Sequence, residues 1–189
     1  HNELMFTPMG AAFFIAPFVN AMVRSGEREE KEVLFQSMLN FKAYEKILSN
    51  KRGHKPGEME NLVTQALRTA TNVKNRQTKT EDETLEKLEG LIHSRNLFQH
   101  KVLLFLLEPG QVDRNVAGLI ANKFMAKYQR PCCILTKVTE KVEKMEGIII
   151  EDVSYQGSAR GCDMSGITNF KDICEQTGRI MYAQGHQGA

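Results

Sequence analysis

Residues 101–138, with the sequence KVLLFLLEPGQVDRNVAGLIANKFMAKYQRPCCILTKV, decide the fold class. Lys101 to Leu107 form a short, continuous apolar run of the kind typical of a buried strand. Pro109-Gly110 then predicts a turn, Val116 to Tyr128 a helix, and Cys132 to Val138 a second strand. A strand, a helix and a strand in this order are typical of an α/β fold.

The rest of the chain adds a third strand and a largely helical N-terminal half. Gly147 to Tyr155 is rich in Ile and Val and predicts a strand, and Phe170 to Thr177 predicts a short helix before a glycine-rich tail. The opening segment to Gly26 is apolar and punctuated by prolines, which predicts irregular structure. Residues 27–48 predict a helix, and residues 51–57 predict a loop.

A long helix is predicted from Glu58 onward, because apolar residues continue at helical spacing to Ile92. Its apolar face begins with Leu62, Ala66, Ala70 and Val73. One long helix or a kinked pair is favoured, and the alternative is a new helix beginning at a capping box over Thr80–Glu83. We therefore expect an α/β fold: a helical segment and a long connecting helix, followed by a small mixed-sheet α/β domain.

Composition places the chain among globular proteins. Its 189 residues are 41% hydrophobic and 25% charged, which is enough for a core and argues against disorder. The net charge of +2 gives no case for nucleic acid. Residues 42–79 nevertheless carry nine Lys or Arg against three Glu. This excess indicates either a surface that binds a nucleic-acid backbone or a solvated helix face.

The four cysteines predict free thiols. Cys132 and Cys133 are adjacent, no CxxC pair is present, and no His stands at ligand spacing. A reduced, cytoplasmic protein is the simplest interpretation. The most apolar early stretch, residues 11–23, is too short to span a bilayer, so no membrane partner is predicted. The chain starts His-Asn-Glu and stops at Gly-His-Gln-Gly-Ala, which predicts a piece of a longer protein.

No motif for catalysis or metal binding is present. A hydrolase that uses Mg²⁺ or Mn²⁺ needs carboxylates and often His gathered around the ions. The sequence has no DxD, Asp-His-His, P-loop, GxSxG or HExxH. We predict no catalytic residue and no metal ligand within this chain.

Four segments carry candidate binding residues. They are Ile15–Arg24 (IAPFVNAMVR), Asn75–Gln77 (NRQ), Asn115–Ala121 (NVAGLIA) with Tyr128–Leu135 (YQRPCCIL), and Gly157–Gly161 (GSARG) with Gly185-His186. Arg76 on a basic helix can fork onto a phosphate and Gln77 can hydrogen-bond to its oxygens, although an exposed polar helix turn is the favoured explanation of these residues taken alone. Ser158 and Arg160, flanked by glycines, can offer a hydroxyl and a guanidinium to one phosphate, or they stabilise a turn. His186, in a glycine-rich turn, has the same two interpretations.

These segments, in this order, resemble the RecJ family of DHH phosphoesterases. The family motif G-P-R-x-N-A-x-G-R is matched at Pro17, Asn20, Ala21 and Arg24, with Phe18 in place of the usual Arg. A second family motif, N-x-x-R-Q, is similar to Asn75-Arg76-Gln77. Residues 115–131 resemble a third family motif, G-V-x-G-I-V-A…R-P, in which Gly118 allows close packing of a helix on a sheet. Ser158-Ala-Arg160-Gly resembles the family's S-x-R-S, and Gln184-Gly-His186 resembles its G-G-H.

The resemblance implies three parts of a larger enzyme. Residues 1–50 would close the DHH catalytic domain, residues 51–98 would form the connecting helix, and residues 99–189 would form the DHH-associated substrate-binding domain. The implied activity is 5′-to-3′ digestion of single-stranded DNA in repair and recombination. Mn²⁺ or Mg²⁺ would be held outside this chain, which alone would be inactive. The substrate-binding residues implied are Asn20, Arg24, Arg76, Gln77, Ser158, Arg160 and His186.

The implied partners are single-stranded DNA and, in repair, a single-strand-binding protein or other repair factors. Two alternatives stay open. One is a DHH-family phosphodiesterase for short oligonucleotides or cyclic dinucleotides, and the other is an inactive RecJ-like scaffold that binds single strands.

Overall fold

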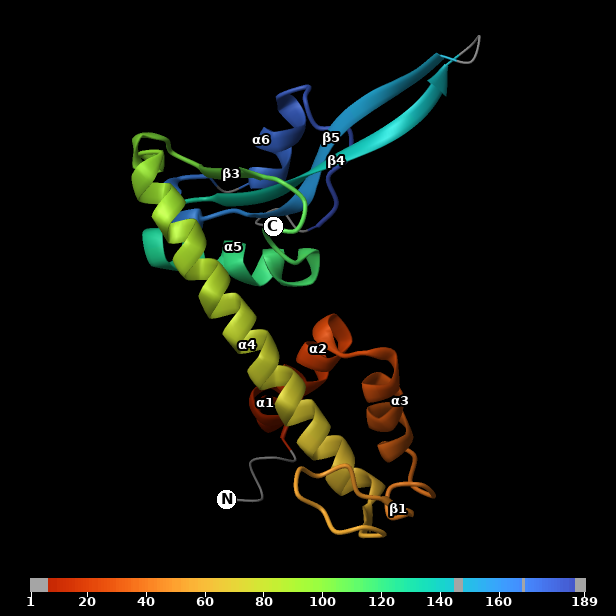
Figure 1. The fold of residues 1–189 in the computed structure, drawn as a ribbon. Helices are drawn as coiled ribbons and strands as arrows, with labels where there is room; N and C mark the ends of the chain where they lie inside the picture. Colours follow the sequence, from red (N-terminus) through yellow and green to blue (C-terminus); the bar gives the residue numbers. More distant parts are fainter. Residues whose placement is uncertain (1–6, 145–147, 168, 186–189) are drawn as a thin grey trace. The chain divides into compact units, whose positions relative to one another are not determined.

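The computed structural model describes residues 7–144, 148–167 and 169–185. The fold is α/β, as predicted, and the chain divides into two compact units, His1–Thr80 and Glu81–Ala189. One helix, α4 (Leu62–Ser94), runs continuously through this boundary (Figure 1). The prediction of a single long helix is therefore confirmed, and the alternative start at a capping box over Thr80–Glu83 is wrong.

The first unit begins with helices, so the prediction of irregular structure up to Gly26 is wrong. The elements are α1 (Pro8–Gly10), a π-helical turn η2 (Ala11–Ile15) and α2 (Ala16–Ser25). The Thr7 side chain caps α1 by accepting a hydrogen bond from the Gly10 amide at 3.0 Å. Pro8 and Pro17 both stand in the first turn of a helix, where the missing N–H removes no helical hydrogen bond. Proline thus starts these helices instead of breaking them.

The helix predicted over residues 27–48 ends early. A capping box at Glu27 starts α3 (Arg28–Ser37), in which Glu30 accepts a hydrogen bond from the Glu27 amide at 2.8 Å. Residues beyond it form turns and then β1 (Lys46–Leu48), which pairs antiparallel with β2 (Met59–Asn61) across the predicted 51–57 loop. Residues 46–48 therefore form their backbone hydrogen bonds with a partner strand and not within a helix.

The core of the first unit lies where α4 meets α2 and α3. Met22, Ala70 and Val73 are buried together, with Phe18 and Leu34 packed against them. The predicted apolar face of the long helix is confirmed, since all four residues are buried: Leu62, Ala66, Ala70 and Val73.

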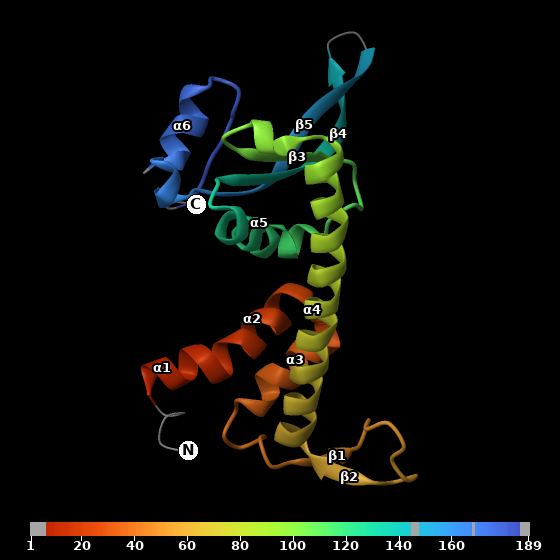
Figure 2. The ribbon, with the colours of Figure 1, turned by 90° about the vertical axis from the view of Figure 1, so that its left-hand side faces the viewer.

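The second unit is a mixed sheet with the order β3-β4-β5. β3 (Leu103–Leu107) runs parallel to β4 (Cys132–Lys144), and β5 (Ile148–Arg160) pairs antiparallel with β4. α5 (Arg114–Tyr128) connects β3 to β4, with Asp113 as its N-cap. Short 3-10 turns (Leu97–Gln99 and Asp163–Ser165) and α6 (Phe170–Gln176) complete the unit. Figures 1 and 2 show α5 and α6 on opposite sides of the sheet.

Two details of the sheet differ from the predictions. β4 and β5 are each 13 residues long, and beyond the five residues that pair with β3 they continue as a two-stranded ribbon (Figure 1). β3 is an edge strand buried on one face, so Leu104 and Leu106 stay about half exposed. The buried face packs on α5 and the end of α4, where the Phe105 and Phe124 rings stack at 5.5 Å.

Candidate nucleic-acid interface

The second unit brings Ser158 and Arg160 together against α5. Both side chains lie on the face of β5 that meets this helix, because residues two apart on a strand point to the same side. Their position is fixed by register with β4, where Ser158 pairs with Ile134 and Arg160 with Cys132. Opposite them on α5 stands Gly118. A β-carbon at Gly118 would lie 2.8 Å from Arg160 Nη2 and 3.4 Å from Ser158 Oγ.

Gly118 therefore gives space to the two predicted binding residues. The sequence assigned this glycine to close packing of the helix on the sheet, and the structure shows that what approaches it is the Arg160 guanidinium. A side chain at position 118 would occupy the place of that guanidinium. Gly118 therefore contributes to the candidate site as well as to the packing of α5 on the sheet.

Arg160 keeps an uncompensated positive charge within the described residues. Its Nη1 donates a hydrogen bond to the Ala159 carbonyl oxygen at 2.6 Å, and no carboxylate in the part of the chain that the structure describes pairs with it. A half-buried guanidinium beside a serine hydroxyl is suited to an anion with several oxygens, because both groups donate hydrogen bonds.

Sequence reasoning missed a second polar pair beside this one. Arg114, in the first turn of α5, donates a hydrogen bond from Nη2 to Gln156 Oε1 at 3.0 Å. Arg114 precedes Gly118 by one helical turn, and Gln156 precedes Ser158 by two strand positions. The alternation of Gln156, Ser158 and Arg160 along one strand was the available signal for this arrangement.

The other predicted residues lie in the first unit, where two of them have internal partners. Arg76 donates to the Glu30 carboxylate (Nη2–Oε2 2.8 Å) and to the Ser25 carbonyl oxygen at 3.3 Å. Burial opposes ionisation of Glu30, but the hydrogen bonds from Arg76 and from the Glu27 amide outweigh it and hold the pKa of Glu30 below its usual value. These contacts fasten α4 to the segment between α2 and α3.

Gln77 is buried and donates a hydrogen bond from Nε2 to Ser25 Oγ at 3.1 Å. This placement favours a structural role for Gln77, with its amide turned into the first unit. Asn20 and Arg24 lie exposed on α2, and Arg24 immediately precedes Ser25. His186 lies outside the described residues. Binding of substrate by these residues stays a prediction.

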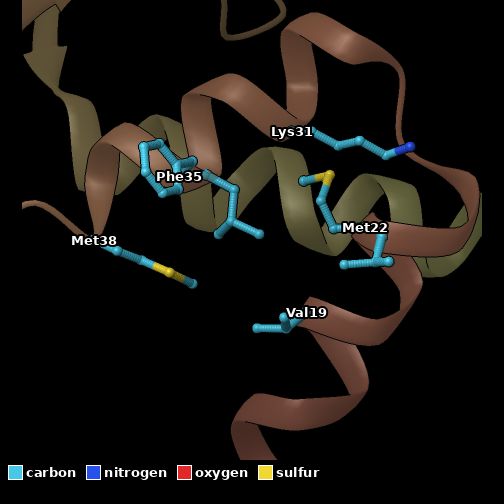
Figure 3. Close-up of a pocket in the computed structure, with 7 residues that line it drawn as sticks. Val19, Met22, Lys31, Phe35 and Met38 are labelled. Atoms are coloured by element: carbon cyan, nitrogen blue, oxygen red, sulfur yellow. The ribbon is translucent and has the colours of Figure 1, made fainter.

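A pocket of about 350 Å³ lies between α2 and α3 (Figure 3). Its lining is apolar apart from Lys31 and includes Val19, Met22, Phe35 and Met38. None of the predicted binding residues lines this pocket. It offers mainly apolar packing surface, with the Lys31 side chain as its one polar lining group among the described residues.

The described residues do not supply a metal site or a membrane span. No group of three or more His, Cys, Asp or Glu side chains within residues 7–144, 148–167 and 169–185 is placed to hold a metal ion. None of the helices that the structure describes is both long enough and apolar enough to cross a membrane. The cysteines are free, as expected from their spacing.

Two curated relatives match almost the entire chain. They are a candidate single-strand DNA-specific exonuclease YorK from the SPbeta prophage of Bacillus subtilis (strain 168), and its counterpart in Bacillus phage SPbeta. Each is 30% identical over 177 residues, which cover 94% of this chain and 29% of the relative. The predicted resemblance to a single-strand DNA-specific exonuclease is confirmed by these two relatives.

The chain spans less than a third of the length of these relatives. Among solved structures, RecJ from Thermus thermophilus in complex with Mg²⁺ matches 94% of this chain and 21% of that one, with 18% identity and a TM-score of 0.46. No family model matches the chain.

Proposed function

We propose that this RecJ-like chain binds the backbone of single-stranded DNA for a 5′-to-3′ exonuclease, and that the Ser158–Arg160 face contacts the first phosphate. One observation carries the proposal: Arg160 is a half-buried guanidinium without a carboxylate partner among the residues described. A charge left in this state is suited to a ligand that brings its own negative charge. The relatives are named for activity on single-strand DNA, which fits such a ligand.

The geometry suggests how a phosphate would be held. Arg160 uses Nη1 for the Ala159 carbonyl oxygen, which orients the guanidinium plane and brings Nη2 next to Gly118. In this proposal one phosphate oxygen accepts from the Arg160 guanidinium, and the Ser158 hydroxyl donates to a second oxygen of the same group. Neither contact distinguishes one base from another, as an exonuclease that digests any sequence requires.

Hydrolysis itself belongs to residues outside this chain in our proposal. Mn²⁺ or Mg²⁺ would activate water there, and the described residues do not fit such an ion. The chain alone is therefore expected to bind strands without cutting them. We place the intact protein in the cytoplasm, in DNA repair or recombination, with a single-strand-binding protein or other repair factors as further partners.

Fluorescence anisotropy with a labelled single strand, with and without a 5′-phosphate, tests the proposal. The chain is expected to bind the phosphorylated strand more tightly. Arg160→Ala should weaken that binding about tenfold or more, since hydrogen bonds to charged groups contribute about 1.5–3 kcal/mol. Arg95→Ala removes an exposed charge that follows α4 and is the matched control, expected to change little. Equal binding of both strands, unchanged in Arg160→Ala, contradicts the proposal.

Two further measurements, of substrate length preference and of cleavage, separate the alternatives. A preference for dinucleotides or cyclic dinucleotides over long strands would indicate a phosphodiesterase for short substrates. Strand binding by an intact protein that shows no metal-dependent cleavage would indicate a scaffold.

A further inference from the structure

We infer that Arg114, held by Gln156, forms a second phosphate position next to the Ser158–Arg160 position, and that the site therefore selects strands with at least two backbone phosphates over mononucleotides. This inference rests on the function proposed above and names the substrate length that the same site prefers.

The two positions follow from the alignment of α5 with β5. Gln156, Ser158 and Arg160 point to the same side of β5, and each step of two residues advances about 6.6–6.8 Å along the strand. On α5, Arg114 and Gly118 are one turn apart, about 6 Å along the helix axis. Arg114 contacts Gln156, and Gly118 lies against Ser158 and Arg160. Positive groups thus stand at both ends of a short polar row.

Arg114 resembles Arg160 in having a neutral partner. Its hydrogen bond goes to an amide oxygen, at 3.0 Å, so its charge is oriented without being neutralised. The adjacent Asp113 carboxylate accepts a hydrogen bond from the Asn115 amide at 2.8 Å as the N-cap of α5, and these two described neighbours, Asp113 and Arg114, form no ion pair.

Two arginines of the first unit show the contrast. Arg68 and Arg76 each donate to a glutamate through both terminal nitrogens, which uses the whole fork within the protein. Arg114 and Arg160 instead donate to an amide oxygen and a backbone carbonyl oxygen. Both guanidinium groups on the α5–β5 face therefore retain charge for an anionic ligand.

A single strand supplies one phosphate per nucleotide, so a second anchor acts only when a second phosphate is present. Removing Arg114 should weaken binding of oligonucleotides and leave binding of a 5′-mononucleotide unchanged. Removing Arg160 should weaken both. Gln156 is a positioning residue, because it orients Arg114 by one hydrogen bond and adds no charge.

The test is a length series of 5′-phosphorylated deoxythymidine ligands, from the mononucleotide to the hexanucleotide, titrated into the chain, Arg114→Ala, Arg114→Lys, Gln156→Ala and Arg160→Ala. The expected result for Arg114→Ala is about a tenfold loss from the dinucleotide upward. For the hexanucleotide, the slope of log affinity against log salt should become shallower by about 0.7, the value for one single-strand phosphate contact. Arg114→Lys should restore most of the slope and only part of the affinity, because it keeps the charge and loses the fork.

The outcomes distinguish failure of the second phosphate position from failure of the proposed function. Equal losses at every length, or none at any length, in Arg114→Ala overturn the second phosphate position while Arg160→Ala still supports the first. If Arg160→Ala and the wild-type chain bind all ligands alike, the proposed function fails, and the inference fails with it. Arg114 is exposed in the first turn of α5, so unchanged thermal melting is expected for both of its variants and verifies that they fold.

Discussion

Gly118→Ala should separate binding from stability. A β-carbon there would stand 2.8 Å from Arg160 Nη2 and 3.6 Å from Arg160 Cζ, with Ser158 Oγ at 3.4 Å. Non-bonded heavy atoms prefer about 3.5–4.0 Å, so the guanidinium must retreat by roughly 0.7 Å or more. Because the clashing atom is the end of a flexible side chain, the helix and the sheet do not have to move apart.

Gly118→Ala should raise the stability of the chain and lower its affinity for the strand. Alanine in place of glycine inside a helix stabilises by about 0.5–1 kcal/mol, which raises the melting temperature by roughly 1–4 °C in a chain of this size. The displacement of the guanidinium is larger than the positional error of about 0.5 Å that a binding site tolerates. The affinity for a 5′-phosphorylated strand should therefore fall about tenfold. Thermal melting and anisotropy on the same sample measure both quantities.

Gly90→Ala is the matched control for this prediction. Gly90 lies within α4, and no heavy atom would stand within 4 Å of its added β-carbon. It should show the same gain in stability with no change in affinity. A Gly118→Ala protein that melts well below the wild type and binds normally would contradict this prediction, because the glycine would then serve helix–sheet packing and not Arg160.

Three further predictions concern stability and reactivity. Gly157→Ala should destabilise by more than about 3 kcal/mol, measured by thermal melting, because its β-carbon would meet a backbone carbonyl oxygen of β4 at 1.9 Å; melting near the wild type would contradict this. The hydrogen bond from Arg68 lowers the pKa of Glu60 to about 2, so Glu60 stabilises above its ordinary pKa near 4.5 and this contribution is lost as the pH falls towards 2. Glu60→Gln should accordingly be less stable than the wild type at pH 7 and equally stable near pH 2, and a constant difference across that range would contradict the assignment. Burial raises the pKa of Cys132 to about 12, so iodoacetamide at pH 8 should label the more exposed Cys174 first; mass spectrometry showing the reverse order would contradict it.

The second unit was predictable because its signals are local. An apolar run, a turn at Pro109-Gly110 and a helical period appear in consecutive residues, and the structure has β3, α5 and β4 in that order. The opening segment of the first unit was not, because the same proline that predicts a break also starts a helix when it stands in the first turn. β1 was missed since its hydrogen bonds reach strand β2 across a loop, which no local period indicates.

The candidate site was predictable only in part, for a similar reason. Ser158 and Arg160 were found from their own segment, but their neighbour Gly118 comes from another element. Arg114 and Gln156 are 42 residues apart in the sequence, so nothing local connects them. Gln77 looked like an exposed polar residue, and its burial against Ser25 depends on where α2 packs.

Hydrogen–deuterium exchange of the chain, with and without a 5′-phosphorylated hexanucleotide, tests most directly whether the α5–β5 face binds the strand. We predict slower exchange in peptides that cover residues 114–118 and 156–160, and no such protection in Arg160→Ala. Protection confined to other segments, or the same protection in wild type and Arg160→Ala, would contradict it.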